Sequence, residues 1–153
     1  MRLLKMSGPQ CLVYAAAMAL DANVNDLIEE IGHNGLAVVW PDLPAPLCYR
    51  SHHIQEIIDC GLARGFALVP IEHNPHQQTG DSTPYKTFIE HEDRFLDHIR
   101  ERDAIMIGQH KKTSIGHAWA WDGDMCYDPN GFIAPLDDYL IMEAWVIFDF
   151  LFD

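Results

Sequence analysis

The sequence of 153 residues predicts an α+β fold, with helices dominating its first two thirds and antiparallel strands its last third. Apolar residues recur at helical spacing up to about residue 100, whereas the later segments are short and rich in β-branched and aromatic residues. Turn sequences separate those later segments at Asp122-Gly123-Asp124 and Pro129-Asn130-Gly131. We therefore expect N-terminal helices packed on a C-terminal antiparallel sheet, in one domain over residues 1–153.

The first helix is expected from Cys11 to Leu20, a run rich in Ala, Leu and Met without Gly or Pro. Its apolar residues lie nearly all round the helix, which predicts a buried position. Ser7 and Gln10 have the spacing of a capping box at its start. Three more helices are expected, at 24–31 with Gly32 as the stop, at 51–62 with Ser51 as the cap, and at 88–100.

The strands are expected at 66–72, 104–108, 116–121, 125–128 and 144–150. The Asp-Gly turn at 122–124 predicts a hairpin between the third and fourth of them. Alternation along the third strand would place His117, Trp119 and Trp121 on one face, with the two alanines between them on the other.

Charge and cysteine content restrict the possible partners. The formal net charge is −13, from 23 acidic and 10 basic residues. Such a surface repels phosphate backbones, and the pair Lys111-Lys112 is too short for a basic patch, so no nucleic acid partner is expected. A neutral or basic peptide fits this charge better than an acidic one.

The four cysteines, at 11, 48, 60 and 126, form no Cys-x-x-Cys pair. Free thiols in a reducing compartment are expected, and the sequence shows neither a signal peptide nor a membrane-spanning segment, so we predict a cytoplasmic protein without a membrane partner. A zinc site can be drawn from Cys48, His52, His73 and His76, but the tight paired spacing of structural sites is missing. We expect no metal and no cofactor.

Three residues form a candidate nucleophilic site. Cys11 lies in the first turn of a helix, where the helix dipole favours a thiolate, the nucleophilic form of cysteine. His117 is the candidate base, and Asp128 is the candidate group that orients it, because the hairpin brings both to the same end of the strand pair. Each has an ordinary alternative: a small core residue, a hydrogen-bonded sheet histidine and a turn-forming aspartate, respectively.

The segment GPQCLVYAAAMALDANVNDLIEEIG resembles the nucleophile helix and the following helix of papain-like cysteine peptidases. The resemblance is closest to the double-glycine (bacteriocin-processing) leader peptidases and their small phage-encoded relatives. IQEIIDCGLARGFALVPI and GHAWAWDGDMCYDPNG are similar to the middle helix–strand unit and the histidine hairpin of that family. The resemblance implies a thiol peptidase acting on a peptide or protein, with Cys11 as nucleophile, His117 as general base and acid, and Asp128 as orienter.

One departure from the family concerns the oxyanion hole. The family usually places a Gln about a turn and a half before the nucleophile, whereas this chain has Lys5, Met6 and Ser7 there. Gln10 and Ser7 are the remaining candidates, and losing one such donor typically costs about 100- to 1000-fold in rate. Trp119 and Trp121 are expected in the core or on the cleft wall.

Three functions stay open at this point. The first is hydrolysis of a peptide, isopeptide or related amide bond through an acyl-enzyme. The second is a catalytically weak or inactive module that binds a peptide or partner protein. The third is acyl transfer to an amine by the same three residues, which shares the acyl-enzyme with the first.

Overall fold

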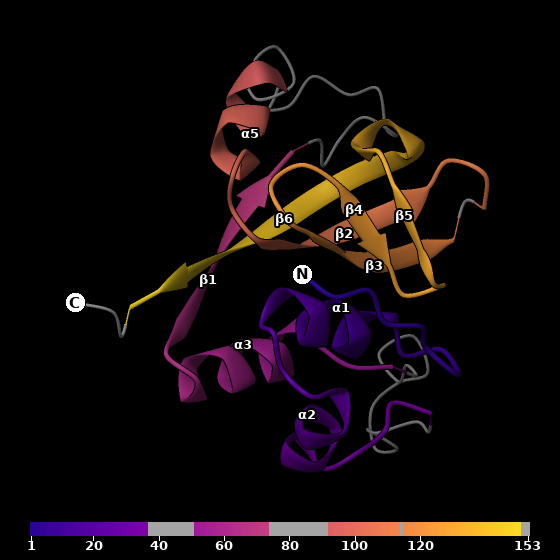
Figure 1. Cartoon of the computed structure of the whole chain (residues 1–153), viewed down its shortest axis with the longest axis vertical. Helices are drawn as coiled ribbons and strands as arrows, with labels where there is room; N and C mark the ends of the chain where they lie inside the picture. The colour runs from indigo at the N-terminus through magenta and orange to yellow at the C-terminus, as the bar shows by residue number, and fades with distance from the viewer. Residues whose placement is uncertain (37–50, 74–91, 114, 151–153) are drawn as a thin grey trace, which may run out of the picture.

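The computed structural model describes residues 1–36, 51–73, 92–113 and 115–150, and it shows an α+β architecture, as predicted (Figure 1). Its strands form a six-stranded antiparallel sheet in the order β1-β6-β2-β3-β4-β5. The strands are β1 (Phe66–Glu72), β2 (Ala104–His110), β3 (Gly116–Trp121), β4 (Cys126–Asp128), β5 (Phe132–Ala134) and β6 (Tyr139–Asp149). The helices are α1 (Cys11–Ala19), α2 (Val24–Ile31), α3 (Ile54–Ala63) and α5 (Glu92–Ile99), with a short 3₁₀ helix at Leu136–Asp138.

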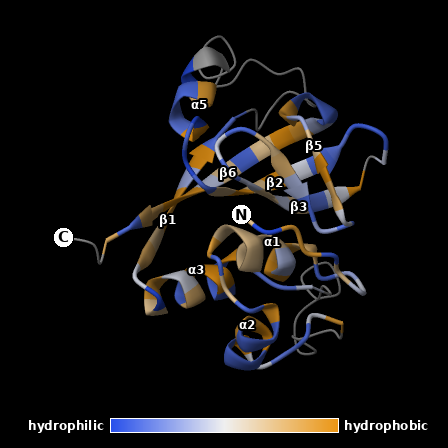
Figure 2. Cartoon of the chain, in the orientation of Figure 1, coloured by the Kyte–Doolittle hydropathy of each residue, from blue (hydrophilic) through white to orange (hydrophobic). Residues whose placement is uncertain are grey.

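Helices cover both faces of the sheet. The group α1, α2 and α3 lies on one face, and α5 lies on the other (Figure 1). Helix α2 turns its hydrophobic side toward α1 and its hydrophilic side outward (Figure 2), which is why Leu27 is fully buried there. None of the helices in the described ranges is long and apolar enough to cross a membrane.

Helix α1 packs on β3 through small side chains. Ala15 and Ala16 of the helix and Ala118 and Ala120 of the strand belong to one buried cluster. Alanines on both sides allow the two backbones to approach closely, so the start of α1 is held firmly against the sheet. The predicted burial of this helix is confirmed, since seven of its nine residues are buried.

The helix caps differ in part from the predictions. Gly32 ends α2 in the left-handed conformation, with φ of 92°, as expected. The capping box predicted for Ser7 and Gln10 is absent, because Gln10 is the N-cap residue of α1 and makes no side-chain cap bond. Helix α3 begins at Ile54 instead of Ser51, and His53 caps it in a capping box with Glu56.

The predicted bounds of β1 and β3 are confirmed. Strand β6 is longer than predicted because it pairs with β1 and β2 at once. Strand β5 has no counterpart in the sequence prediction; it is three residues long and pairs only with β4 in the described sheet. Residues 88–91 of the predicted helix at 88–100 lie outside the described ranges.

Candidate active site

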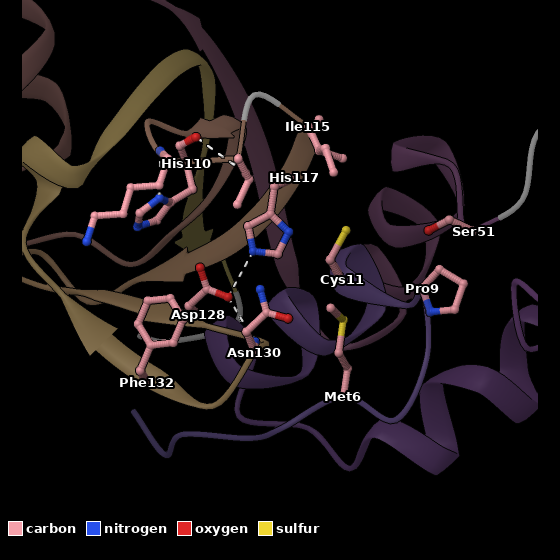
Figure 3. A pocket seen from close by; sticks show the side chains of 13 residues that line it. Met6, Pro9, Cys11, Ser51, His110, Ile115, His117, Asp128, Asn130 and Phe132 are labelled. Carbon is pink, nitrogen blue, oxygen red and sulfur yellow. Dashed lines mark hydrogen bonds and ion pairs between the residues drawn. The ribbon is translucent and has the colours of Figure 1, made fainter.

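Cys11 opens onto a cavity of about 480 Å³ at the end of the sheet (Figure 3). It is the first residue of α1 and is half-buried, so its thiol is accessible from the cavity. The other two cysteines in the described ranges, Cys60 and Cys126, are buried. Cys48 lies outside the described residues.

His117 lies between Cys11 and Asp128. Its Nε2 is 2.9 Å from Oδ1 of Asp128, and the Cys11 thiol is the other group that acts on its ring. Figure 3 shows the other ring nitrogen, Nδ1, facing the sulfur. Because a carboxylate only accepts, Nε2 carries the proton that points to Asp128. The predicted meeting of these three residues is present in the structure.

The environment of His117 favours its protonated form. Burial would lower the pKa of His117, but the hydrogen bonds to Asp128 and Cys11, with the negative charge that each can carry, raise it to about 9. An imidazolium therefore persists at neutral pH. A protonated imidazole beside a cysteine is the pairing that thiol nucleophiles use in acyl transfer.

Asp128 is fully buried, yet it stays ionised. Burial would raise the pKa of this carboxyl group, but hydrogen bonds from His117, the main-chain N–H of Asn130 and the hydroxyl of Tyr139 lower it below its usual value. A buried carboxylate with three donors is rigid, and it holds the His117 ring in one orientation.

Tyr139, which sequence reasoning did not identify, completes this arrangement. Its hydroxyl lies 2.7 Å from Oδ2 of Asp128, and its ring stacks on Trp119 with the centroids 4.0 Å apart. The residue begins β6 and is buried. Nothing in one sequence marks it, because the contact joins strands that are not neighbours in the sheet.

The hairpin between β3 and β4 positions His117 relative to Asp128. Asp122 accepts hydrogen bonds from the main-chain N–H groups of Asp124 and Met125, and Gly123 has φ of 96°. This turn sets the register in which Trp121 pairs with Cys126. The sequence-based expectation of a hairpin here is confirmed.

Gln10 and Ser7, the two oxyanion candidates, do not line the cavity. Gln10 is buried, and its Nε2 donates to the main-chain oxygen of Asn34 at 2.6 Å. Ser7 is exposed to solvent. The sequence placed both close to Cys11, but the loop that accepts the Gln10 amide could not be foreseen.

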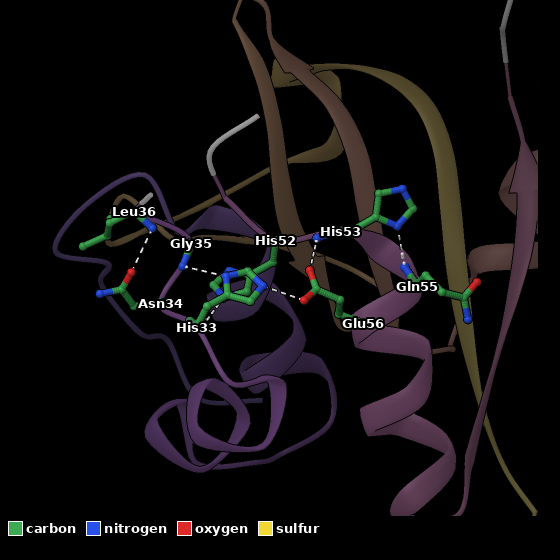
Figure 4. Close-up of polar contacts among 8 residues, drawn as sticks. All are labelled: His33, Asn34, Gly35, Leu36, His52, His53, Gln55 and Glu56. Carbon is green, nitrogen blue, oxygen red and sulfur yellow. Dashed lines mark hydrogen bonds and ion pairs between the residues drawn. The ribbon is translucent and has the colours of Figure 1, made fainter. Parts of the chain in front are cut away.

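The segment that holds Gln10 is anchored to the start of α3 (Figure 4). His33 pairs with Glu56, and the ring of His52 stacks on that of His33 at 4.7 Å. His52 also donates from Nε2 to the main-chain oxygen of His33 at 2.9 Å. These contacts keep Asn34 in place beside the helix that carries Cys11.

Trp119 and Trp121 are core residues and do not line the cavity. Both belong to the cluster under α5, and Nε1 of Trp121 donates to the main-chain oxygen of Ile99 at 2.8 Å. Their predicted common face is confirmed and packs against α5, so they occupy the core, which was one of the two places expected for them.

Of the residues considered for zinc, Cys48 and His76 lie outside the described ranges. Among the residues that the structure describes, no group of His, Cys, Asp or Glu is arranged to hold a metal ion.

The remaining cavity wall is mostly apolar. It includes Met6, Pro9, Ile115 and Phe132, with Asn130, His110 and Lys112 as polar members. Figure 3 shows the Asn130 amide beside the His117 ring, and His110 and Phe132 on the side of that ring away from Cys11.

No protein-family model matches this sequence. A search of curated proteins likewise found no match.

Proposed function

We propose that this protein is a thiol-dependent hydrolase of the papain-like type that cleaves a peptide, isopeptide or related amide bond. The observation that carries the proposal is the His117 ring held between a half-buried cysteine at a helix start and a fully buried carboxylate. Structural cysteines and histidines seldom combine an accessible thiol, a raised imidazole pKa and an adjoining cavity.

The reaction follows from the positions of these groups. The Cys11 sulfur attacks the carbonyl carbon, and the C=O electron pair moves to the oxygen. As the C–N bond breaks, the proton on His117 passes to the departing amine and leaves an acyl-enzyme. Neutral His117 then takes a proton from water, whose oxygen attacks the thioester, and the acid product leaves with the thiol restored.

The developing oxyanion needs donors at the mouth of the cavity. The main-chain N–H of Cys11 is in the first turn of α1, and no described residue accepts a hydrogen bond from it. The Asn130 amide, which lines the cavity beside His117, is the candidate for the second donor. It would replace the upstream Gln that the resembling family uses.

Thiol labelling tests the proposal directly. Burial raises the pKa of Cys60 to about 11 and that of Cys126 to about 12, so both should react slowly with iodoacetamide at pH 7. Cys11 should react far faster, and His117→Ala should remove that advantage. A peptidyl epoxide should label the wild-type protein at Cys11 and leave Cys11→Ser unlabelled.

The outcomes separate the three functions. Slow labelling of Cys11 in a folded protein would contradict the hydrolase and favour a binding module. Rapid labelling followed by an acyl-enzyme that yields mainly amide product, when a primary amine is added at low concentration, would favour acyl transfer.

A further inference from the structure

The charge lining the cavity is opposite in sign to that of the whole chain. Lys112 and His110 line it, and Asp128 is the only carboxylate among its described lining residues. Asp128 is fully buried and its oxygens are occupied by His117, Tyr139 and Asn130. The exposed part of the lining therefore holds a permanent cation and no anion, in a chain of net charge −13.

Lys112 is available to a ligand. It is exposed, and within the described part of the chain it forms no ion pair. Its main-chain N–H donates to Nδ1 of His110 at 3.1 Å, which holds the turn that carries it. The neighbouring Lys111 does not line the cavity, and its main-chain N–H donates to the oxygen of Asp138 instead.

The local cation decides binding more than the net charge does. At physiological salt, exposed charges farther apart than about 8 Å are largely screened from each other. The acidic residues spread over the surface therefore act weakly on a ligand inside the cavity, whereas Lys112 is part of the cavity wall.

Lys112 lines the cavity and is close in the chain to His117, and His117 marks the side of the site where the amine product departs. The amine must face His117, because that imidazolium supplies its proton. Lys112 lies in the connection from β2 to β3, a few residues before His117 of β3. At the end of β2, the ring of His110 packs edge-on against that of Phe132, with the ring centroids 6.2 Å apart. Phe132 is 41% exposed and Ile115 is 69% exposed, so the cavity wall offers two large apolar surfaces near His117.

We propose that the substrate carries a carboxylate on the leaving-group side of the scissile amide, beside an apolar group, and that Lys112 recognises it. This rests on the proposed hydrolase function. The carboxylate is the end of the chain in a short leaving group, or an Asp or Glu side chain in a longer one. Such a leaving group differs from the neutral or basic peptide that the net charge alone suggested.

The test uses fluorogenic peptides with one acyl half and four leaving halves. The leaving halves are Leu with a free carboxylate, Leu amide, Leu-Asp amide and Leu-Lys amide. The wild type should cleave the best carboxylate peptide about three- to tenfold faster, in kcat/KM, than Leu amide. Which of the two carboxylate peptides wins distinguishes a chain end from an acidic side chain, and added salt should shrink the preference.

Lys112→Glu should reverse the order of kcat/KM values, so that the Leu-Lys amide peptide is cleaved fastest. Lys112→Met should abolish the preference for the carboxylate peptides. Lys111→Glu is the matched control, since it changes the net charge equally from a position outside the cavity wall. Equal cleavage of all four peptides, or the same loss with Lys111→Glu, would overturn the assignment of Lys112.

Binding to Cys11→Ala separates this inference from the proposed function. Fluorescence anisotropy with the four leaving halves should show the same order of affinity without any chemistry. A carboxylate preference in binding, together with no cleavage by the wild type, would remove the hydrolase and keep the recognition site. No preference in binding, together with intact cleavage by the wild type, would remove the recognition site and keep the hydrolase.

Discussion

Tyr139 donates its hydroxyl proton to the oxygen of Asp128 that His117 leaves free, at 2.7 Å. The carboxylate is thus held at both oxygens, one by the imidazole and the other by the phenol. Because the Tyr139 ring is itself stacked on buried Trp119, the orientation of His117 depends on the packing of the core on the far face of the sheet.

Tyr139→Phe should therefore alter the pH dependence of catalysis. Removing one donor leaves Asp128 a more basic carboxylate that interacts more strongly with the imidazolium, so the pKa of His117 should rise above about 9, and the alkaline limb of the kcat/KM profile should move to higher pH. The free energy of unfolding should fall by about 1.5–3 kcal/mol, since a hydrogen bond to a charged group is lost. Tyr127→Phe is the control, because its hydroxyl bonds Asp122 at the hairpin turn. An unchanged alkaline limb in Tyr139→Phe would remove Tyr139 from the positioning network.

His117 should make stability fall at alkaline pH. Its pKa is raised in the folded protein from the usual 6.5 to about 9, so the stabilising imidazolium is fully present below 6.5 and is lost as pH rises to about 9. Urea unfolding should show a loss on the order of 2 kcal/mol over this range. His117→Gln should be less stable at pH 6 and nearly flat over the same range. A wild-type slope that His117→Gln retains would assign the effect to other groups.

His52 should make stability fall at acid pH. Its Nε2 donates to His33, its Nδ1 is buried without a hydrogen-bond partner among the described residues, and burial lowers its pKa. The unfolded chain takes up a proton below pH 6.5 and the folded protein does not, so stability is retained above 6.5 and declines as pH falls below it. His52→Gln should lose less stability than wild type between pH 7 and 5. That window lies above the range where Glu56 matters, because its pKa is below 4.5. Parallel curves for the two proteins would exclude His52 as the titrating group.

Gly108 and Gly116 form a matched pair on neighbouring strands. A Cβ at Gly108 would lie 2.0 Å from the main-chain oxygen of Leu140, where the pairing of β2 and β6 shifts register. A Cβ at Gly116 would meet nothing within 4 Å. Gly108→Ala should lower the free energy of unfolding by more than about 2 kcal/mol, because backbone must move, and Gly116→Ala by less than about 0.5 kcal/mol. Thermal unfolding of both variants measures the difference, and equal melting temperatures would contradict it.

Local sequence patterns predicted the elements that depend on short-range physics. Gly32 ends α2 because it accepts a left-handed backbone, and the Asp122-Gly123 turn closes the hairpin through its own side-chain bonds. The same reasoning failed at the start of α3, where His53 caps the helix instead of Ser51. Histidine is an unusual cap, and its choice depends on Glu56 reaching back to it.

The hairpin was enough to predict that His117 and Asp128 would meet, because hairpin registers follow from spacing within a few residues. The meeting of Cys11 with His117 was predicted from the order of the three residues and the resemblance to papain-like peptidases. Three features were decided only by the tertiary structure. They are the hydrogen bond from the Tyr139 hydroxyl to Asp128, the hydrogen bond from the Gln10 amide to the main-chain oxygen of Asn34, and the burial of two tryptophans, Trp119 and Trp121, under α5. Each joins segments far apart in the chain, and such contacts depend on which faces pack together, which the spacing of residues in one segment does not specify.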